Sequence, residues 1–246
     1  MSSIEFTSVT HRYHATVALD NVSIAFADDV VTAVVGRSGS GKSTLLQCIN
    51  GLVRPAAGDV RVFGDAIDYQ RLVALRRRIG YAVQGVGLFP HMTVRQNITL
   101  LARVAGASDA SMGARSDELM ALVELPADYR TRYPHELSGG EQQRVGLCRA
   151  MMLDPPIMLL DEPFGALDSI TKSEVHGEFL RVQQLAPRTV VLVTHDLREA
   201  VRLAQRLVVI EGGRIVQHDA LEMVLEHPAT DEIAGLIASQ LGGRTA

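Results

Sequence analysis

The sequence predicts an α/β fold with a mostly parallel sheet, an N-terminal antiparallel β layer and an inserted α-helical lobe. Three observations carry this prediction. Short apolar runs at 30–35, 157–160 and 190–193 are typical of buried parallel strands. Residues 4–26 alternate between apolar and polar in two stretches, as antiparallel strands do. Residues 93–125 follow a helical pattern instead, so we expect a helical lobe within one compact unit.

The composition is that of a globular protein with ample material for a core. The chain has 246 residues, of which 47% are hydrophobic, and a formal net charge of −4. No run of basic residues is longer than Arg76-Arg77-Arg78, so we expect no nucleic acid partner. The first residues lack a signal-peptide pattern, and no apolar run approaches the roughly 20 residues that span a bilayer. We therefore expect a cytoplasmic protein.

The two cysteines, Cys48 and Cys148, lie within helical patterns and have neither metal-binding nor disulfide spacing. We expect a reducing compartment and a packing role for both side chains.

The N-terminal β layer is predicted from Ile4–Thr10 and Ala18–Phe26, which alternate in strand fashion. Tyr13 lies between the two stretches. Its ring fits two roles equally well at this stage, a core residue at the end of a strand or a stacking platform for a nucleotide base.

The stretch Gly36–Thr44 fits the phosphate-binding pattern G-x-x-x-x-G-K-[ST] in full. It lies between the apolar strand Val30–Val35 and the helical stretch Leu45–Ile49, which is the context that the motif requires. Its glycines allow a tight turn that directs backbone N–H groups at phosphate, and the helix N-terminus adds positive potential. The residues expected to bind the nucleotide are Gly36, Ser38, Gly39, Ser40, Gly41, Lys42, Ser43 and Thr44. Lys42 contributes a full charge, and Ser43 offers a hydroxyl to Mg²⁺.

The next segment contains a short strand at Asp59–Gly64, a basic helix at Leu72–Arg78 and a strand at Ile79–Gln84 that ends in an amide. The flexible loop Gly85–Met92 follows and carries the apolar side chains Leu88, Phe89 and Met92. These side chains indicate either a partner surface or a small satellite core under the loop.

The helical lobe is expected at about 88–154, inserted into a catalytic core formed by about 1–87 and 155–246. Thr93–Leu125 is expected to be helical, with Ser116-Asp117-Glu118 opening its last segment as a cap and an acidic first turn.

Ser138-Gly139-Gly140-Glu141 opens the next helical pattern. Ser138 with Glu141 three residues later is a capping box, which is a structural reason for the pair. Gly139 and Gly140, however, destabilise a first turn by roughly 1 kcal/mol each relative to Ala. Because glycine lets a ligand approach the backbone closely, a second anion site is the sharper interpretation.

Asp161 and Glu162 follow the apolar run Ile157–Leu160, so two carboxylates lie at the carboxyl end of a predicted buried strand. Beside a phosphate-binding loop, Asp161 is the expected Mg²⁺ ligand and Glu162 the expected base for a water molecule. The strand Val190–Val193 ends in His195 at the same edge of the sheet, where the imidazole is well placed to contact a terminal phosphate.

The C-terminal part is expected to contain a turn at Gly165–Asp168 and an amphipathic helix at Thr171–Ala186. A hairpin follows around Glu211–Arg214, and helices at Leu221–Glu226 and Ile233–Ser239 close the chain.

The ordered set of motifs resembles the ATP-binding cassette (ABC) ATPases, which have a P-loop NTPase (RecA-like) core. The motifs that carry the resemblance are the phosphate-binding loop, Gln84, Leu137–Glu141, Leu160–Pro163, Ala166–Asp168 and His195. They span nearly the whole chain. The resemblance implies a Mg²⁺-dependent ATPase that acts as a head-to-tail homodimer with two ATP molecules at the interface.

Several residue roles follow from this resemblance. It implies that Ser138 and Gly140, with Gly139 and Glu141, cap the γ-phosphate of the ATP held by the second copy, and that Asp168 contacts that copy. Tyr13 matches the family's adenine-stacking aromatic residue.

The resemblance also implies a mechanism and a location. Glu162 would activate the attacking water, His195 would stabilise the γ-phosphate, and Gln84 would sense Mg²⁺ and the water. Transmembrane permease subunits would dock near Gln84, Leu88 and Phe89, so the protein would lie at the inner face of the cell membrane. A substrate-binding protein would be only an indirect partner.

A narrower resemblance concerns the transported solute. The stretches Arg78–Tyr81, Gly87–Val94, Tyr133–Leu137 and Asp154–Ile157 look like those of osmoprotectant (glycine betaine, choline, proline) importer ATPases. Many such subunits extend into a C-terminal regulatory domain, which this sequence, ending at Ala246, is expected to lack.

Other functions fit the sequence less well. An importer of another small solute or a lipid or drug exporter would share the same motifs. A P-loop kinase would not need Ser138–Glu141, and a non-transport ABC protein would usually fuse two cassettes or carry basic insertions.

Overall fold

The computed structural model describes residues 2–83, 85, 87–165 and 167–242. The chain divides into two compact units, which are described separately. The first unit comprises Met1–Leu72 and Arg188–Ala246, and the second comprises Val73–Pro187. The lobe at about 88–154 and its surrounding core remain a prediction about the organisation of the whole chain.

Ten strands and nine α-helices are assigned within the described residues, with two short 3-10 turns. The strands are β1 (Ser2–Tyr13), β2 (Thr16–Ala27), β3 (Val31–Val35), β4 (Ala57–Val62), β5 (Asp65–Ala66), β6 (Ile79–Ala82), β7 (Ile157–Asp161), β8 (Thr189–Val193), β9 (Arg206–Glu211) and β10 (Arg214–Ala220). The helices are α1 (Lys42–Ile49), α2 (Leu72–Arg77), α3 (Val94–Val104), α4 (Asp109–Leu122), α5 (Gly139–Met151), α6 (Ser169–Leu185), α7 (Leu197–Leu203), α8 (Leu221–Glu226) and α9 (Asp231–Leu241). The 3-10 turns are η1 (Ala127–Thr131) and η2 (Pro134–Glu136).

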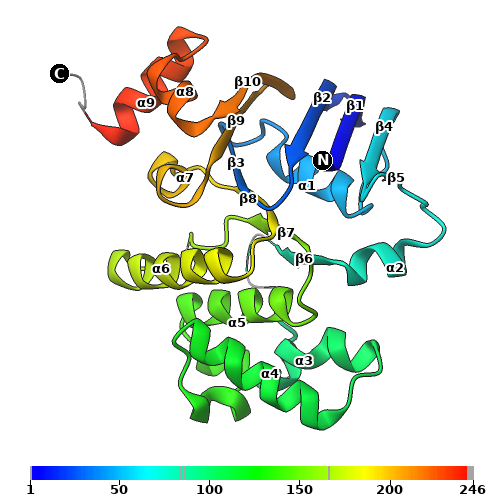
Figure 1. Cartoon of the computed structure of the whole chain (residues 1–246), viewed down its shortest axis with the longest axis vertical. Helices are drawn as coiled ribbons and strands as arrows, with labels where there is room; N and C mark the ends of the chain where they lie inside the picture. The colour runs from blue at the N-terminus through cyan, green and yellow to red at the C-terminus, as the bar shows by residue number, and fades with distance from the viewer. Residues whose placement is uncertain (1, 84, 86, 166, 243–246) are drawn as a thin grey trace. The chain divides into compact units, whose positions relative to one another are not determined.

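The first unit contains the predicted antiparallel layer, in the strand order β2-β1-β4-β5. β1 and β2 form a hairpin, and Figure 1 shows them beside β4. Leu19, Val22, Ile24 and Phe26 of β2 are buried, while the residues between them are more exposed. This alternation confirms the predicted strand, because one face of an antiparallel layer packs on the core.

The second sheet of the first unit has the order β10-β9-β3-β8. β3 is parallel to both β8 and β9, and every residue of β3 and β8 is buried, as predicted for central parallel strands. The β9–β10 hairpin is antiparallel, as predicted. Because parallel strands end at the same edge, the segments that follow β3 and β8 emerge side by side.

The second unit contains the parallel pair β6 and β7. Its helices α3, α4 and α5 pack against one another in the lower part of Figure 1. Asn97 of α3 is fully buried and holds the preceding loop. Its side-chain oxygen accepts from the Phe89 N–H, and its side-chain NH₂ donates to the carbonyls of Phe89 and Met92.

The predicted cap at Ser116 is wrong. Ser116 lies inside α4 and is fully buried, whereas α4 begins at Asp109 with Ser108 as its N-cap. The Ser108 side chain accepts a hydrogen bond of 3.3 Å from the Ser111 N–H. A serine followed by acidic residues occurs in helix interiors as well as at helix starts, so the local pattern did not distinguish the two positions.

Both cysteines are buried, as predicted for a packing role. Burial raises the pKa of the Cys48 thiol to about 12. Burial also raises the pKa of Cys148, whose thiol donates to the Leu119 carbonyl at 3.2 Å. Neither thiol is therefore ionised near neutral pH, so neither is a ready nucleophile or metal ligand.

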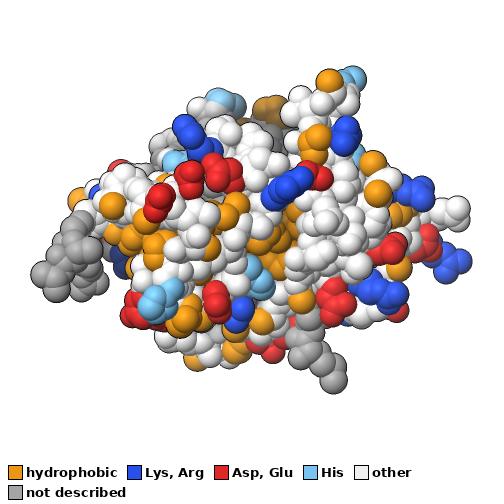
Figure 2. Space-filling model, turned by 90° about the horizontal axis from the view of Figure 1, so that it is seen from above, with side chains coloured by type: hydrophobic (Ala, Val, Ile, Leu, Met, Phe, Trp, Pro, Cys, Tyr) orange, Lys and Arg blue, Asp and Glu red, His pale blue; other side chains and the backbone are white. Residues whose placement is uncertain are grey.

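On the face seen in Figure 2, Lys and Arg side chains are interspersed with Asp and Glu. None of the helices in the described part of the chain is long and apolar enough to cross a membrane.

Candidate functional site

The phosphate-binding loop follows β3 and is enclosed by backbone on two sides. A Cβ on Gly36 would lie 2.2 Å from the Ile210 carbonyl oxygen of β9, and a Cβ on Gly41 would lie 2.2 Å from the Ala18 carbonyl oxygen of β2. Gly41 also has a φ of 106°, which L-residues rarely adopt. The glycines of the motif are thus required by the close approach of two neighbouring strands as well as by the turn itself.

The turn of the β9–β10 hairpin holds the loop in place. The Gly213 N–H donates to the Ser40 carbonyl at 3.1 Å, and the Asp20 N–H donates to the Gly213 carbonyl at 2.9 Å. An ion pair of 2.7 Å between Arg214 and Asp20 closes the same contact. A hairpin from the end of the chain therefore fixes the loop to β2.

The N-terminus of α1 is left open for an anion. Gly41 is the N-cap and supplies no side-chain hydrogen bond, and the first turn of α1 contains no acidic residue. The first N–H groups of a helix have no partner within the helix, and the helix dipole adds positive potential there. This arrangement fits a phosphate group.

Two polar side chains of the loop support this interpretation. Lys42 Nζ donates to the carbonyls of Gly36 at 2.8 Å and Arg37 at 2.9 Å, which holds its charge over the loop. Ser40 Oγ is buried and forms no hydrogen bond among the described residues. A buried hydroxyl without a partner is costly, so it marks a position where a ligand can supply one.

Tyr13 lies at the end of β1 and is 44% exposed, which excludes the role of a core residue. Its hydroxyl donates to Gln47 Oε1 at 3.3 Å, so the ring lies next to the helix that follows the phosphate-binding loop. The His11 ring packs edge to face against it at 4.7 Å between centroids. The exposed ring is thus held in a fixed place within reach of that helix.

His195 follows β8 in the first unit and is exposed, whereas Thr194 before it is buried. The Thr194 hydroxyl donates to Glu199 at 2.5 Å and accepts from the Asp196 N–H at 3.0 Å. These bonds fix the backbone on both sides of His195. The parallel pairing of β3 and β8 places His195 and the phosphate-binding loop at the same edge of the sheet.

Sequence reasoning missed Gln240 of α9. Its side chain accepts from the Leu197 N–H at 2.6 Å and donates to the His195 carbonyl at 3.1 Å. No local pattern could have found this contact, because the partners are more than forty residues apart in the chain.

The other predicted site residues lie in the second unit, except Gln84, which lies outside the described residues. Asp161 ends β7 and is 2% exposed. Glu162 follows with a φ of 50°, a left-handed conformation that is unfavourable for a side chain with a Cβ. This backbone turn directs the two neighbouring carboxylates differently, with Asp161 buried and Glu162 partly exposed.

The segment that follows Glu162 packs on α6 through an aromatic contact. Phe164 is fully buried, and the His176 ring of α6 lies against it edge to face at 4.6 Å between centroids. The segment that carries Glu162 is thus anchored on α6.

Ser138 and Glu141 form the predicted capping box at the start of α5. The Ser138 hydroxyl accepts from the Glu141 N–H at 3.3 Å, and the Glu141 carboxylate accepts from the Ser138 N–H at 2.7 Å. Burial alone would raise the pKa of Glu141, but the hydrogen bonds with Ser138 and Tyr129 and the charge of Arg144 together lower that pKa. The structural role of the pair is confirmed, and a second anion site at Gly139 and Gly140 stays a prediction.

Asp168 is the N-cap of α6. Its carboxylate accepts from the N–H groups of Ile170 and Thr171, each at 3.1 Å. Hydrogen bonds from Thr171 lower the pKa of Asp168. The side chain is exposed, so it is available for a contact beyond this chain.

Leu88 is partly exposed and Phe89 is 42% exposed, so the predicted satellite core under this loop is at most partial. Within the described ranges, no group of three His, Cys, Asp or Glu side chains is arranged to hold a metal ion.

Comparison with known proteins gives consistent results. The family model described as "ABC transporter" matches residues 19–165. The chain is 45% identical, over 98% of its length and 79% of the relative's, to the "Glycine betaine uptake system ATP-binding protein YehX" of Escherichia coli (strain K12). It is 41% identical, over 98% of its length but only 63% of the relative's, to the "Choline transport ATP-binding protein OpuBA" of Bacillus subtilis (strain 168).

A solved structure shows the same fold. The "Dimeric structure of a post-hydrolysis state of the ATP-binding cassette MJ0796 bound to ADP and Pi" is similar with a TM-score of 0.84 and 31% identity, covering 89% of this chain and 98% of that one. The predicted fold class, an α/β P-loop NTPase, is thereby confirmed. Because the family model matches more than half of the sequence and the relatives match nearly all of it, the chain belongs to the ABC transporter family.

Proposed function

We propose that the chain is the ATP-binding and ATP-hydrolysing subunit that powers an importer of osmoprotectants, a class that includes quaternary amines. The observation that carries this proposal is the open N-terminus of α1 within the backbone cradle around Gly36 and Gly41. This phosphate site lies in a chain that is 45% identical to an ATP-binding protein named for glycine betaine uptake.

In this proposal the first unit holds the nucleotide. The Tyr13 ring stacks on adenine, which typically contributes about 1–3 kcal/mol per base in alanine substitutions. Gly36 and residues 38–44 bind the phosphates through backbone N–H groups and the Lys42 ammonium.

Mg²⁺ would be held by the Ser43 hydroxyl, the Asp161 carboxylate and Gln84, together with phosphate oxygens. These oxygen donors suit Mg²⁺, which is usually bound through one or two carboxylates and the phosphates of the substrate. The near-complete burial of Asp161 fits this role, since a buried carboxylate is favourable beside a cation. Held by these residues, Mg²⁺ would supply positive charge that neutralises the phosphate oxygens during transfer.

Glu162 orients the attacking water and accepts its proton, and the left-handed backbone at this residue sets the direction of its side chain. His195 contacts the γ-phosphate, and Gln84 responds to the water and the cation. The contact between the Phe164 and His176 rings holds the segment that carries the base on α6.

We propose that two copies form a head-to-tail dimer around two ATP molecules. Ser138, Gly139, Gly140 and Glu141 of one copy then cap the γ-phosphate bound by the other, and Asp168 contacts the second copy. A similar cassette is dimeric with ADP and Pi bound, which supports this arrangement. ATP binding favours the closed dimer and hydrolysis releases it.

The dimer passes this movement to transmembrane permease subunits at the inner face of the membrane. Phe89 and Leu88, near Gln84, form the contact, and the buried Asn97 amide keeps their loop in a defined shape. The binding protein meets the permease, so it is only an indirect partner of this chain.

Reconstituted transport tests the proposal. The chain is combined in liposomes with the permease that copurifies with it, and uptake of labelled glycine betaine is measured with ATP inside. We expect uptake that the Glu162→Gln variant abolishes. Uptake of a different solute at the same ATPase rate would retain the ATPase role and overturn the osmoprotectant assignment. Absence of ATP hydrolysis would overturn both.

A further inference from the structure

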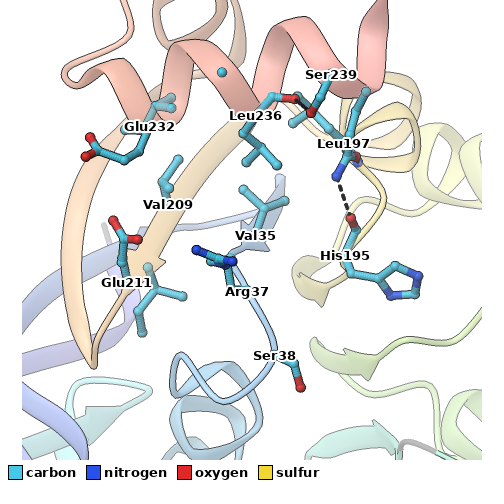
Figure 3. A pocket seen from close by; sticks show the side chains of 15 residues that line it. Val35, Arg37, Ser38, His195, Leu197, Val209, Glu211, Glu232, Leu236 and Ser239 are labelled. Atoms are coloured by element: carbon cyan, nitrogen blue, oxygen red, sulfur yellow. Dashed lines mark hydrogen bonds between the residues drawn. The ribbon is translucent and has the colours of Figure 1, made fainter.

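The first unit contains an open groove of about 480 Å³ beside the phosphate-binding loop (Figure 3). Its volume lies within the range of small-molecule sites, roughly 300–1,000 Å³. α9 forms one wall, and β9 and the end of β3 form the other. The floor is apolar, with Val35, Val209 and Leu236 turned toward one another in Figure 3.

The groove borders the nucleotide site without reaching the N-terminus of α1. Tyr13, Lys42, Ser43 and Thr44 are not among the residues that line it. It touches the start of the phosphate-binding loop at 36–38 and the segment that carries His195, whose imidazole points away from the groove in Figure 3. A ligand in the groove would therefore lie behind the loop rather than on the α1 N-terminus.

Three charged side chains line the groove. Arg37 lies toward its middle, and Glu211 and Glu232 lie together toward one end (Figure 3). All three are exposed, and within the described part of the chain none of them forms an ion pair. One cation and two anions thus border an apolar floor without being neutralised by one another.

We infer that this groove binds a small zwitterion that carries a carboxylate and a quaternary ammonium group on a short apolar body. Arg37 is suited to the carboxylate because its guanidinium presents paired donors. Glu211 and Glu232 attract the ammonium, and the floor accepts its methyl groups. An uncharged apolar ligand would fit the floor but would give none of the three charges a partner.

Gln240 couples this groove to the site of hydrolysis. Its side chain joins α9, one wall of the groove, to the backbone of His195 and Leu197. A ligand that bridges α9 and Arg37 therefore restrains both the start of the phosphate-binding loop and the His195 segment. The expected result is lower ATPase activity when the zwitterion is bound. If this zwitterion is the imported solute, its binding inhibits further import as feedback. This last step rests on the proposed function.

Calorimetry on the full chain tests the inference, with glycine betaine and carnitine as probes. A small ligand with a few polar contacts is expected to bind with a dissociation constant of about 1 mM. Choline supplies the cation alone and isovalerate the carboxylate alone, so both are expected to bind about tenfold more weakly or not at all. Equal affinity for choline and betaine would overturn the zwitterion assignment, and no binding of either betaine would overturn the site.

Gly235 offers a variant that blocks the groove. It lines the groove within α9, and an added Cβ would meet no atom within 4 Å, so a larger side chain can project into the cavity. Gly235→Leu is expected to abolish zwitterion binding and the associated inhibition while basal ATPase activity is kept. Gly235→Ala is the matched control, because it adds one methyl group to the same helix position. The Glu211→Gln and Glu232→Gln double variant is expected to weaken binding about tenfold.

ATP titrations on the same preparations separate this inference from the proposed function. Intact ATP binding and hydrolysis without zwitterion binding would overturn the groove site and leave the ATPase role standing. Zwitterion binding that is unchanged in Gly235→Leu and displaced by ATP would also overturn the inference, because the ligand would then lie in the nucleotide site. Thermal denaturation of each variant confirms that it is folded.

Discussion

Lys42 Nζ donates a hydrogen bond of 2.8 Å to the carbonyl oxygen of Gly36, the first residue of the same loop. The bond closes the loop over the N-terminus of α1 and keeps the ammonium beside the uncapped N–H groups. Both carbonyls are uncharged, so a hydrogen bond from the ammonium to a phosphate oxygen is stronger than either of these two bonds.

The Lys42→Ala variant should therefore lose nucleotide binding. We expect ATP affinity to fall about 100-fold or more, because a charge-assisted hydrogen bond to phosphate contributes up to about 3 kcal/mol. Isothermal titration calorimetry measures the change. Lys172→Ala is the matched control, since Lys172 is the second lysine of the sequence and lies on α6. Near-normal ATP affinity in Lys42→Ala would contradict the assignment of the phosphate site.

Glycine substitutions test how closely the neighbouring strands enclose the loop. Gly41→Ala places a Cβ 2.2 Å from the Ala18 carbonyl at a φ of 106°, so we expect a loss of at least about 1–3 kcal/mol in the free energy of unfolding. Gly177→Ala in α6 adds a Cβ that meets nothing within 4 Å, and should instead stabilise the helix by about 1 kcal/mol. Chemical denaturation compares the two. Equal stabilities would mean that the loop tolerates displacement from β2.

Glu162→Gln separates binding from hydrolysis. The amide cannot accept the proton of water, so we expect turnover to slow by about 10²–10⁴-fold while ATP still binds. Dimers should accumulate with ATP, as measured by light scattering. Glu174→Gln, an exposed position on α6, should behave like the unaltered protein. If Glu162→Gln stays monomeric at saturating ATP, the shared-site dimer is wrong.

A comparison of two serine N-caps tests whether Ser138, at the start of α5, does more than cap its helix. Ser138→Ala and Ser108→Ala each remove a side-chain oxygen that caps a helix, so each should lower the free energy of unfolding by about 1 kcal/mol. Only Ser138→Ala should also lose ATP-dependent dimerisation and ATPase activity. Equal activity in the two variants would assign Ser138 to helix capping alone.

The capping box also predicts a dependence on pH. The folded state lowers the pKa of Glu141, so its contribution to stability is present above the unfolded pKa of about 4.3 and is lost as pH falls through the lower folded pKa. Glu141→Gln should therefore differ most from the unaltered protein above that pKa and converge with it in acid. Urea unfolding at several pH values measures this, and a constant difference would contradict it.

Charged substitutions at Leu88 and Phe89 test the permease contact. Leu88→Asp with Phe89→Asp should disrupt copurification with the permease and leave the ATPase activity of the isolated chain unchanged. Ile170→Asp is the control, because Ile170 is 71% exposed on α6. Unchanged copurification of the double variant would favour a local packing role for these side chains.

The local pattern of residues in the sequence was sufficient to predict most helices and strands and the phosphate-binding role of Gly36–Thr44. Alternation predicted β2, continuous apolar runs predicted β3, β7 and β8, and the serine and glutamate spacing predicted the capping box of α5. Each of these depends on residues close together in sequence. The prediction of a helix cap at Ser116 was wrong because it also used only neighbouring residues, and their pattern fits a helix interior equally well.

By itself, the sequence determined the phosphate-binding loop, the paired carboxylates at the end of β7 and the family to which the chain belongs. Only the tertiary structure showed that a side chain at Gly41 would meet the Ala18 carbonyl. Ala18 lies on β2, in a different sheet from the strand β3 that leads into the loop. The tertiary structure also decided that Gln240 holds the His195 segment and that a groove lies between α9 and Arg37. The physical reason is that these features join segments distant in sequence, whose proximity depends on packing and leaves no local periodicity.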